Sequence, residues 1–593
     1  MNILGINAYH GDASAALLQD AQLVAAIEEE RFNRIKHWAG FPAQSIRYCL
    51  EVGGITAGDL DHIAISFNPR ANLGHRLAFL AARRPSARAI LDRLRRQTKT
   101  LGLKQQFADA VGVSPARIRT KFHRLEHHQT HVAAGFLISP FDEAAVLSID
   151  GMGDFTSTMT AHARGQDWSV LERVHFPHSL GFLYTAMTMY LGFPHYGDEY
   201  KVMGLAPYGE PEFIGVMRRI VRPYRNTFRL NLDYFTHHKQ GVRMNWNGGA
   251  PVVQPMHSRR LETELGPMRM KDEEPTKRHE NIAKSLQAVT EEIIFHLLNR
   301  LHARTQSRSV CLTGGVAMNS VAIGKITSQT PFEKVYVPAG AADNGTSFGA
   351  AYYVWNRILG KPRSFVQDHA YWGCASSNDE CARAIRDAGL PFDTCDDQQL
   401  VQRTADLLIN GHVVGWFQGR MEFGARALGN RSLLADPRRA DMRDIINLRI
   451  KFREKFRPFA PSILEEHVGE WFEIDESAPY MEKVSPIRAE KRELIPAVTH
   501  VDGTGRLQSV SRRTNPLYYA LIAEFHRKTR VPIILNTSLN ENEPIVRTPE
   551  EAVSCFLRTD MDAIILGPHV VRRHDPRYPN SRNRLQTHTT QTR

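Results

Sequence analysis

Basic side chains gather between residues 415 and 463, in the motifs GARALGNRSLLADPR and KFREKFRPFAPS. Arg426 and Arg431 stand close together in the first motif, and Lys451 and Arg457 follow in the second. Guanidinium groups bind phosphate or carboxylate through paired hydrogen bonds, and lysine adds a point charge. Glycines between the charges allow the backbone to approach a ligand closely. The pattern predicts an anion-binding site, with a basic face on an ordinary helix as the alternative.

A second group of reactive side chains begins in the upstream motif EHHQTHVAAGF. His127 and His131 are four residues apart, so on a helix they share one face, which is a metal-ligand spacing. Asp150 ends the apolar run AAVLSID, and Asp343 follows the apolar strand KVYVP, where strand ends deliver ligands to a crevice. Two histidines and two aspartates suit iron, zinc or manganese. A metallopeptidase is disfavoured because HHQTH lacks the glutamate of HExxH.

The elements that position these residues follow an α/β pattern. Residues 1–18 read as strand, turn and strand, and QLVAAIEEERFNRIKH as a strand running into a helix. An amphipathic helix is expected over 281–304, followed by a strand that ends in Gly314 and Gly315. Backbone N–H groups freed at such a turn bind phosphate, although a tight connection without a ligand is the alternative. Residues 359–369 resemble a linker, and no internal repeat is visible.

Composition limits the classes of function. A chain of 593 residues with 42% hydrophobic content should hold two or more domains. The net charge of +12 fits either nucleic-acid binding or an enzyme that handles several phosphates, and much of the excess lies in residues 76–124, which read as amphipathic basic helices. No apolar run approaches the ~20 residues of a membrane span, and the N-terminus is not a signal peptide. Six scattered cysteines fit a reducing cytoplasm.

Ten motifs, in order over roughly 1–572, resemble the NodU/CmcH family of O-carbamoyltransferases. They are AYHGDASAAL, EEERFNRIKH, EHHQTHVAAGF, GDEYKVMGLAPYG, LTGGVAMN, ADNGTSFGAA, GARALGNRSLLADPR, KFREKFRPFAPS, THVDGTGRLQSV and LNTSLNENEPIV. The resemblance implies an α/β protein. An N-terminal actin-like (ASKHA) ATPase-type domain over 1–362 would be followed by a YrdC-like mixed α/β domain over 363–573 and a disordered tail over 574–593.

The resemblance also implies two half-reactions. The C-terminal domain would form carbamoyladenylate from carbamoyl phosphate and ATP, with Mg²⁺ accompanying ATP. The N-terminal domain, with a mononuclear iron, would transfer the carbamoyl group to a hydroxyl of a small molecule or natural product. Neither nucleic acid nor membrane is an expected partner, a homodimer is favoured, and the expected location is the cytoplasm. Threonylcarbamoyl transfer to tRNA adenosine is the alternative, while a non-catalytic scaffold would not need two anion sites.

Carried onto this sequence, the resemblance assigns residues to the N-terminal site. The metal ligands would be His127, His131, Asp150 and Asp343, with His128 pointing away. The nucleotide-binding residues would be Lys201, Gly314, Gly315, Asn319 and Asn344. His10 in the first turn and Lys36, at the end of the ERFNRIK helix, would lie near the carbamoyl group. There His10 would orient the carbonyl or assist deprotonation of the acceptor, with an exposed turn histidine as the alternative.

The resemblance likewise assigns the C-terminal site. The residues around carbamoyl phosphate and ATP would be Arg426, Lys451, Arg457, Arg506, Asn536 and Ser538. Fixed cations there lower the cost of bringing several negative charges together. Glu422 and Asp436 would either contact magnesium or pair with neighbouring arginines. The family usually has proline where this chain has Ala425, and because alanine removes no ligand atom, function should be retained.

Overall fold

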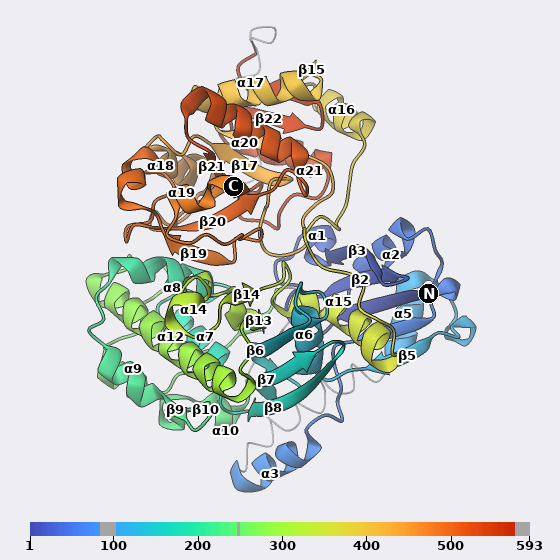
Figure 1. The fold of residues 1–593 in the computed structure, drawn as a ribbon, viewed down its shortest axis with the longest axis vertical. Coiled ribbons are helices and arrows are strands. Elements are labelled where there is room, and N and C mark those ends of the chain that lie inside the picture. Colours follow the sequence, from blue (N-terminus) through green and yellow to red (C-terminus); the bar gives the residue numbers. More distant parts are fainter. Residues whose placement is uncertain (84–101, 243, 246–249, 576–593) are drawn as a thin grey trace. The chain divides into compact units, whose positions relative to one another are not determined.

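The computed structural model describes residues 1–83, 102–242, 244–245 and 250–575. The chain divides into two compact units, Met1–Gln367 and Asp368–Arg593 (Figure 1). The sequence placed this boundary between residues 362 and 363, inside the same predicted linker. The predicted tail lies outside the described residues apart from 574 and 575. Within the basic segment 76–124, residues 84–101 also lie outside the described residues, and the parts on either side include helices.

The first unit contains two five-stranded sheets with the same topology (Figure 1). In each sheet three strands form an antiparallel meander, and two further strands extend in parallel from the first of them. The first sheet has the order β3-β2-β1-β4-β5, and its strands are β1 (Asn2–Asn7), β2 (Ser14–Gln19), β3 (Gln22–Glu28), β4 (His62–Ile65) and β5 (Lys121–Arg124). The second has the order β8-β7-β6-β13-β14, and its strands are β6 (Glu143–Gly153), β7 (Thr156–Arg164), β8 (Asp167–His175), β13 (Ser309–Thr313) and β14 (Lys334–Tyr336).

This duplicated strand order is that of the actin-like fold, so the fold class predicted for the N-terminal domain is confirmed. The sequence showed no repeat because the two halves share an order of strand pairing rather than side chains. The smaller strands of this unit are β9 (Val221–Tyr224), β10 (Thr227–Leu230), β11 (Met244–Asn245) and β12 (Val252–Val253). Its helices are α1 (Glu30–Asn33), α2 (Ala43–Val52), α3 (Leu73–Arg83), α5 (Leu103–Val111), α6 (His127–Phe136), α7 (Leu180–Tyr190), α8 (Glu199–Leu205), α9 (Ile214–Ile220), α10 (His237–Gln240), α11 (Arg259–Leu265), α12 (Lys277–Thr305), α13 (Ser320–Ile323), α14 (Ile326–Gln329) and α15 (Thr346–Tyr352).

Two of these helices join the sheets. α15 packs on β1 and β2, α6 packs on β6 and β13, and the two helices contact each other. Glycine permits these close approaches, because a Cβ on Gly349 would lie 2.1 Å from the carbonyl oxygen of Thr130 in α6. A Cβ on Gly5 in β1 would lie 1.9 Å from the carbonyl oxygen of Ser347 in α15. The turn before α15 therefore comes close to the N-terminus of α6.

The local predictions for this unit hold with one exception. The strand–turn–strand opening is present, and α12 contains the helix expected over 281–304, with a capping box between Thr276 and His279. The helix expected to end at Lys36 is wrong. α1 ends at Asn33 because Arg34 adopts a left-handed conformation with φ of 60° and closes the turn onto the carbonyl of Glu30.

The second unit is built on one mixed nine-stranded sheet with the order β15-β23-β22-β16-β17-β21-β18-β20-β19. Its strands are β15 (Asp393–Thr394), β16 (Val414–Phe417), β17 (Arg431–Ala435), β18 (Ala460–Leu464), β19 (Lys483–Pro486), β20 (Thr504–Val510), β21 (Ile533–Ser538), β22 (Ala563–Leu566) and β23 (His569–Arg572). Its helices are α16 (Asn378–Asp387), α17 (Asp397–Ile409), α18 (Met442–Ile446), α19 (Val468–Trp471), α20 (Pro516–Thr529) and α21 (Pro549–Arg558). The unit is thus mixed α/β, as predicted.

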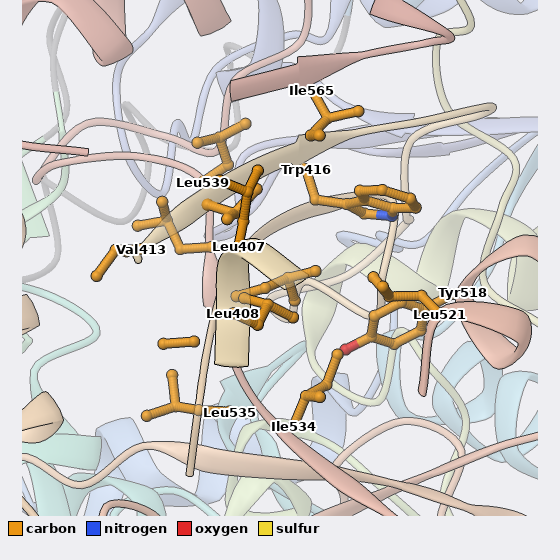
Figure 2. Packing of buried hydrophobic residues seen from close by; sticks show 14 of the residues in the cluster. Leu407, Leu408, Val413, Trp416, Tyr518, Leu521, Ile534, Leu535, Leu539 and Ile565 are labelled. Atoms are coloured by element: carbon orange, nitrogen blue, oxygen red, sulfur yellow. The ribbon is translucent and has the colours of Figure 1, made fainter. Parts of the chain in front are cut away.

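The core of the second unit explains why its strands form. β16, β21 and β22 carry the apolar runs VGWF, IIL and AIIL, whose side chains are buried. Trp416 packs in one cluster with Ile534 and Ile565 of the sheet and with Leu408 and Tyr518 of the helices (Figure 2). Near-continuous apolar strands indicate a sheet covered on both faces. This core fixes the strand ends that carry the basic residues.

Candidate active sites

Four side chains converge in the first unit, as the sequence predicted. His127 and His131 lie on α6, Asp150 lies on β6, and Asp343 begins the turn before α15. The Nε2 atoms of the two histidines are 3.0 Å apart, and Oδ1 of Asp343 is 3.3 Å from each. Oδ2 of Asp150 is 3.7 Å from Nε2 of His127. Bonds of about 2.0–2.2 Å to one ion place neighbouring ligand atoms roughly 3 Å apart, so the arrangement fits a mononuclear metal.

Further contacts orient the side chains of these candidate ligands. Nδ1 of His127 donates to the carbonyl of Ser66 at 3.3 Å, which leaves Nε2 free to bind a metal. A Cβ on Gly153 would lie 2.0 Å from Cδ2 of His127, so only glycine lets β6 approach the imidazole this closely. Oδ1 of Asp343 is buried and accepts no hydrogen bond from any described residue. A cation among the four ligands would satisfy that oxygen.

The charges of His127 and Asp343 are stabilised by their neighbours in the cluster. Burial opposes a charge on His127, but Asp150 and Asp343 outweigh it and hold its pKa well above the ordinary value. Burial likewise opposes a charge on Asp343, and the two histidines nevertheless hold its pKa well below the usual range. Without a metal, the cluster therefore retains a proton on imidazole. Metal binding releases such a proton, since only neutral imidazole is a ligand.

His128 is not part of the cluster. Its Nδ1 lies 2.7 Å from Oγ of Ser148 and its Nε2 lies 3.0 Å from the carbonyl oxygen of Thr156. The ring is buried and directed toward β6 and β7. The neighbouring histidine of the motif therefore supports the packing of α6 on the second sheet.

The double glycine contacts the same centre in a way that the sequence did not predict. The Gly315 N–H donates to Oδ1 of Asp150 at 2.8 Å, and the Gly314 N–H donates to the carbonyl of Ala341 at 2.7 Å. A Cβ on Gly314, whose φ is 91°, would lie 2.2 Å from the carbonyl oxygen of Ile149. These N–H groups were expected to be free for phosphate, and that expectation is wrong, because both are used to orient Asp150 and close the turn.

The other residues expected to bind the nucleotide also have partners. The amides of Asn319 and Gln287 form two reciprocal hydrogen bonds of 3.0 Å, and Asn319 also caps α13. Nδ2 of Asn344 donates to Glu28 at 2.9 Å, and Lys201 pairs with Asp198 at 3.1 Å. These contacts tie the strands and helices around the metal ligands together. Nucleotide binding by these residues stays a prediction.

His10 and Lys36 are placed differently. The His10 ring lies 4.4 Å from the His127 ring, and its buried Nδ1 accepts no hydrogen bond from the described chain. Burial and the neighbouring His127 lower the pKa of His10 to about 4, so the imidazole is neutral near pH 7. Lys36 is exposed in a turn after α1, where its charge acts on Glu30 and His37. His10 thus adjoins the metal ligands directly.

A cluster of arginines forms the candidate site of the second unit. Arg506 on β20 is half-buried, and its buried Nε has no hydrogen-bond partner in the described part of the chain. Burial, followed by Arg426, Arg453 and Arg457, holds its pKa well below the usual range. No carboxylate among the described residues lies within ion-pair distance of Arg506. Such uncompensated positive charge favours an anionic ligand.

Three of these arginines were predicted and Arg453 was missed. Its Nε donates to the side chain of Asn447 at 2.7 Å, and its guanidinium lies 4.7 Å from the Phe459 ring. The motif KFREKFR contains basic residues at 451, 453, 455 and 457, and their spacing alone does not show which of them turn toward β20. The sequence therefore contained Arg453 among four candidate basic residues but did not distinguish it from the other three.

Two basic residues from the predicted anion site make contacts within the protein, and anion binding by Lys451 stays a prediction. Arg431 is fully buried, stacks 3.7 Å above the Phe417 ring and donates to the backbone carbonyls of Cys374, Gln418, Gly419 and Asn430. Lys451 is buried, and its ammonium donates to Ser538 and Asn540 at 2.6–2.7 Å. These contacts favour a structural role for Arg431 over the anion binding that the sequence predicted, because both terminal nitrogens of its guanidinium donate to backbone carbonyls.

The neutral and acidic residues of this region hold the loops as well. Nδ2 of Asn536 contacts Ala427, Ser462 and Gln508, while its buried Oδ1 accepts no hydrogen bond from the described residues. Oε1 of Glu422 accepts backbone N–H groups of the glycine-rich loop, from Leu428, Asn430 and Arg431. Asp436 pairs with Arg438 at 2.6 Å. Of the two open interpretations, Asp436 follows the arginine pairing, and Glu422 instead caps the loop backbone.

No helix in the described ranges is long and apolar enough to cross a membrane.

The carbamoyltransferase N-terminus family model matches residues 2–352, and the carbamoyltransferase C-terminus model matches residues 405–573. The chain is 38% identical to the uncharacterized protein sll1178 of Synechocystis sp., with 96% of each protein covered. It is 39% identical to nodulation protein NolNO of Sinorhizobium fredii, over 96% of this chain and 80% of that protein.

Nodulation protein U of Rhizobium tropici is 26% identical, over 91% of each protein. Among solved structures, HypF from T. kodakarensis is similar with 14% identity and a TM-score of 0.33, over 60% of this chain and 48% of that one. That score is too low to support a fold assignment, which rests on the strand order. Because the two family models together cover most of both units, the chain belongs to the carbamoyltransferase family.

Proposed function

We propose that the chain is an ATP-dependent O-carbamoyltransferase that forms carbamoyladenylate in the second unit and transfers its carbamoyl group in the first. One observation carries the proposal: a single chain of this family holds four candidate metal ligands in one unit and, in the other, a cluster of arginines around Arg506, which pairs with no carboxylate of the described residues. The first suits a divalent cation and the second suits phosphates. One site suited to a cation and one suited to phosphates match the needs of a transfer and an adenylation.

In the second unit, carbamoyl phosphate, ATP and water would give carbamoyladenylate, pyrophosphate and phosphate. Arg426, Arg457 and Arg506 would hold the phosphate groups of both substrates, with Arg453 added to the predicted set. These arginines repel one another in the ligand-free protein, and a bound anion would relieve that repulsion. Mg²⁺ would accompany ATP and neutralise further charge. Asn536 and Ser538 would add neutral hydrogen bonds at the end of β21.

In the first unit, an acceptor hydroxyl would attack the carbamoyl carbon of the adenylate. The C–O bond to the adenylate phosphate would break, and AMP would leave. His10 would accept the hydroxyl proton, since it is neutral and its buried Nδ1 is unpartnered. His127, His131, Asp150 and Asp343 would hold the metal, which we infer to be iron, with zinc or manganese also compatible. That metal would supply positive charge that binds the adenylate.

The acceptor would be a small-molecule hydroxyl, as in natural-product tailoring. Threonylcarbamoyl transfer to tRNA is the second candidate from the sequence. The matches to carbamoyltransferase models in both units do not favour it. Incubation with tRNA, threonine, bicarbonate and ATP would support that candidate only if it released pyrophosphate where carbamoyl phosphate did not.

The direct test is incubation of the purified protein with carbamoyl phosphate, ATP and Mg²⁺ but without acceptor. Mass spectrometry should detect carbamoyladenylate, and a coupled assay should detect pyrophosphate. Absence of both products would contradict the proposal. Detection of both would reduce the remaining question to a screen of hydroxyl acceptors.

Paired variants separate the two sites. Arg457→Ala should abolish adenylate formation, and His131→Ala should leave it intact while abolishing use of supplied carbamoyladenylate. Arg439→Ala and His162→Ala are matched controls, because these residues pair with Asp441 and Glu143 near the surface. If both site variants lost both half-reactions while the controls kept them, the two-site proposal would be wrong.

A further inference from the structure

A tyrosine outside every predicted set lies against the first turn. Tyr196 belongs to the loop between α7 and α8, and its hydroxyl approaches Gly11, next to His10. A Cβ on Gly11 would lie only 2.4 Å from the Tyr196 hydroxyl oxygen. Glycine at this position therefore admits the phenol beside the residue that adjoins the metal ligands.

A histidine contacts the tyrosine ring and is itself held by an aspartate. Nδ1 of His37 lies 2.8 Å from Oδ1 of Asp12, and the His37 ring meets the Tyr196 ring edge-on at 5.5 Å and 68°. A Cβ on Gly197, whose φ is 85°, would lie 2.3 Å from Nε2 of His37. The loop and the imidazole are thus packed at a distance that only glycine allows, which fixes the phenol.

The hydroxyl itself is left without a protein partner. Tyr196 is half-buried, and no described residue forms a hydrogen bond with its oxygen. Burial raises its pKa well above the ordinary value, with further contributions from Asp343, Asp12 and Asp150. The phenol is therefore a neutral donor, and the negative charges of Asp343, Asp150 and Asp12 act on it. A fixed donor with no partner beside a reactive centre suits a bound substrate.

We propose that Tyr196 is a catalytic residue of the transfer site, whose hydroxyl donates a hydrogen bond to the carbamoyl carbonyl oxygen of the adenylate. Attack by the acceptor hydroxyl on the carbamoyl carbon moves the carbonyl electron pair onto this oxygen, and Tyr196 stabilises the charge. The pair returns when the bond to the AMP phosphate breaks. The acceptor proton goes to His10. His37 and Asp12 are positioning residues. The inference rests on the proposed function and adds the donor that the transfer requires.

Two adenosine analogues test this contact by calorimetry. One is 5′-O-(N-carbamoylsulfamoyl)adenosine, which keeps the carbamoyl carbonyl, and the other is 5′-O-sulfamoyladenosine, which lacks it. All variants are made in an Arg457→Ala background, which disables the second unit. Tyr196→Phe should bind the first analogue about 10-fold more weakly and the second equally well, since one hydrogen bond is lost. AMP release from supplied carbamoyladenylate should fall about 100-fold.

Tyr352→Phe is the matched control. It removes the hydroxyl that donates to the carbonyl of Ala21, away from the metal ligands, and should leave both affinities unchanged. Metal content should stay equal in all three proteins. Equal weakening of both analogues, or loss of metal with Tyr196→Phe, would overturn the assignment and leave a structural role. If the Arg457→Ala parent bound neither analogue and released no AMP, the proposed transfer itself would fail, and this inference with it.

Discussion

The two candidate sites solve opposite electrostatic problems. In the first unit, histidines meet aspartates, and each side shifts the pKa of the other toward its charged form despite burial. In the second unit, burial and then the charges of Arg426, Arg453 and Arg457 lower the pKa of Arg506. A cluster of balanced charge is stable without its ligand and exchanges a proton for a metal. A cluster of one sign is strained without its ligand and gains most when an anion binds.

The same comparison separates two arginines that look alike in sequence. Arg431 is buried deeply, yet its guanidinium is surrounded by carbonyl oxygens and rests on an aromatic ring. Arg506 is less buried, and no described residue accepts a hydrogen bond from any nitrogen of its guanidinium. Burial alone therefore does not mark a binding residue. The absence of any acceptor around the guanidinium does, because it leaves an energetic gain for a ligand.

The largest expected effect breaks the balanced cluster. His131→Ala removes one of the four proposed ligands, and we expect metal affinity to fall by at least about 100-fold. Elemental analysis after dialysis against a competing chelator measures it. His128→Gln is the comparison, because His128 lies on the same helix but points away from the ligands. Equal metal loss in the two variants would show that α6 packing, and not ligation, retains the metal.

The next effect tests the structural arginine. Arg431→Met should lower the free energy of unfolding of the second unit by about 4 kcal/mol, because several buried carbonyls lose their donors. Denaturant unfolding followed by the fluorescence of Trp416 and other tryptophans measures the change. Arg439→Met, at an exposed ion pair, should change stability by less than about 1 kcal/mol. A mild Arg431 variant with impaired phosphate binding would restore the original assignment of this residue to the anion site.

A pH dependence distinguishes the first unit. Burial lowers the pKa of His37, but Asp12 and Glu30 outweigh it and raise the pKa to about 9. The pKa of His37 in the unfolded chain is about 6.5. The contribution of charged His37 to the stability of the folded chain is therefore full below pH 6.5 and is lost as pH rises through 9. The side chain is 30% exposed, and after solvent screening we expect about 1–2 kcal/mol.

Comparison of His37→Gln with the parent at pH 6 and pH 10 measures this term. The parent should lose stability of the first unit between these values, and the variant should lose less. Identical pH profiles would show that the His37–Asp12 pair contributes nothing to stability and acts only on the orientation of its neighbours.

The smallest expected effect is a gain in stability when a side chain is replaced. Arg506→Met should stabilise the ligand-free second unit by about 0.5–1 kcal/mol, because it removes one charge from a cluster of like charges. Inorganic pyrophosphate should raise the melting temperature of the parent more than that of the variant. A destabilised variant with an unchanged response to pyrophosphate would show that the arginine cluster is structural.

Much of the N-terminal site could be predicted because its information is local. His127 and His131 share a face by helix geometry, and Asp150 and Asp343 each follow an apolar strand. The prediction failed where a backbone partner decided the outcome. Gly314 and Gly315 looked like phosphate donors, but their N–H groups bind Ala341 and Asp150. Sequence shows which donors exist and not which acceptors reach them.

The family, the actin-like order of elements and the residue types of both sites could be predicted from the amino-acid sequence alone. Packing between elements set which basic side chains face one another and which donate to the loop backbone. It also decided that Tyr196 meets Gly11 and His37, although these residues are distant along the chain. The physical reason is that helix and strand periodicity are set by neighbours within a few residues. The partner of a buried donor is set by packing between elements.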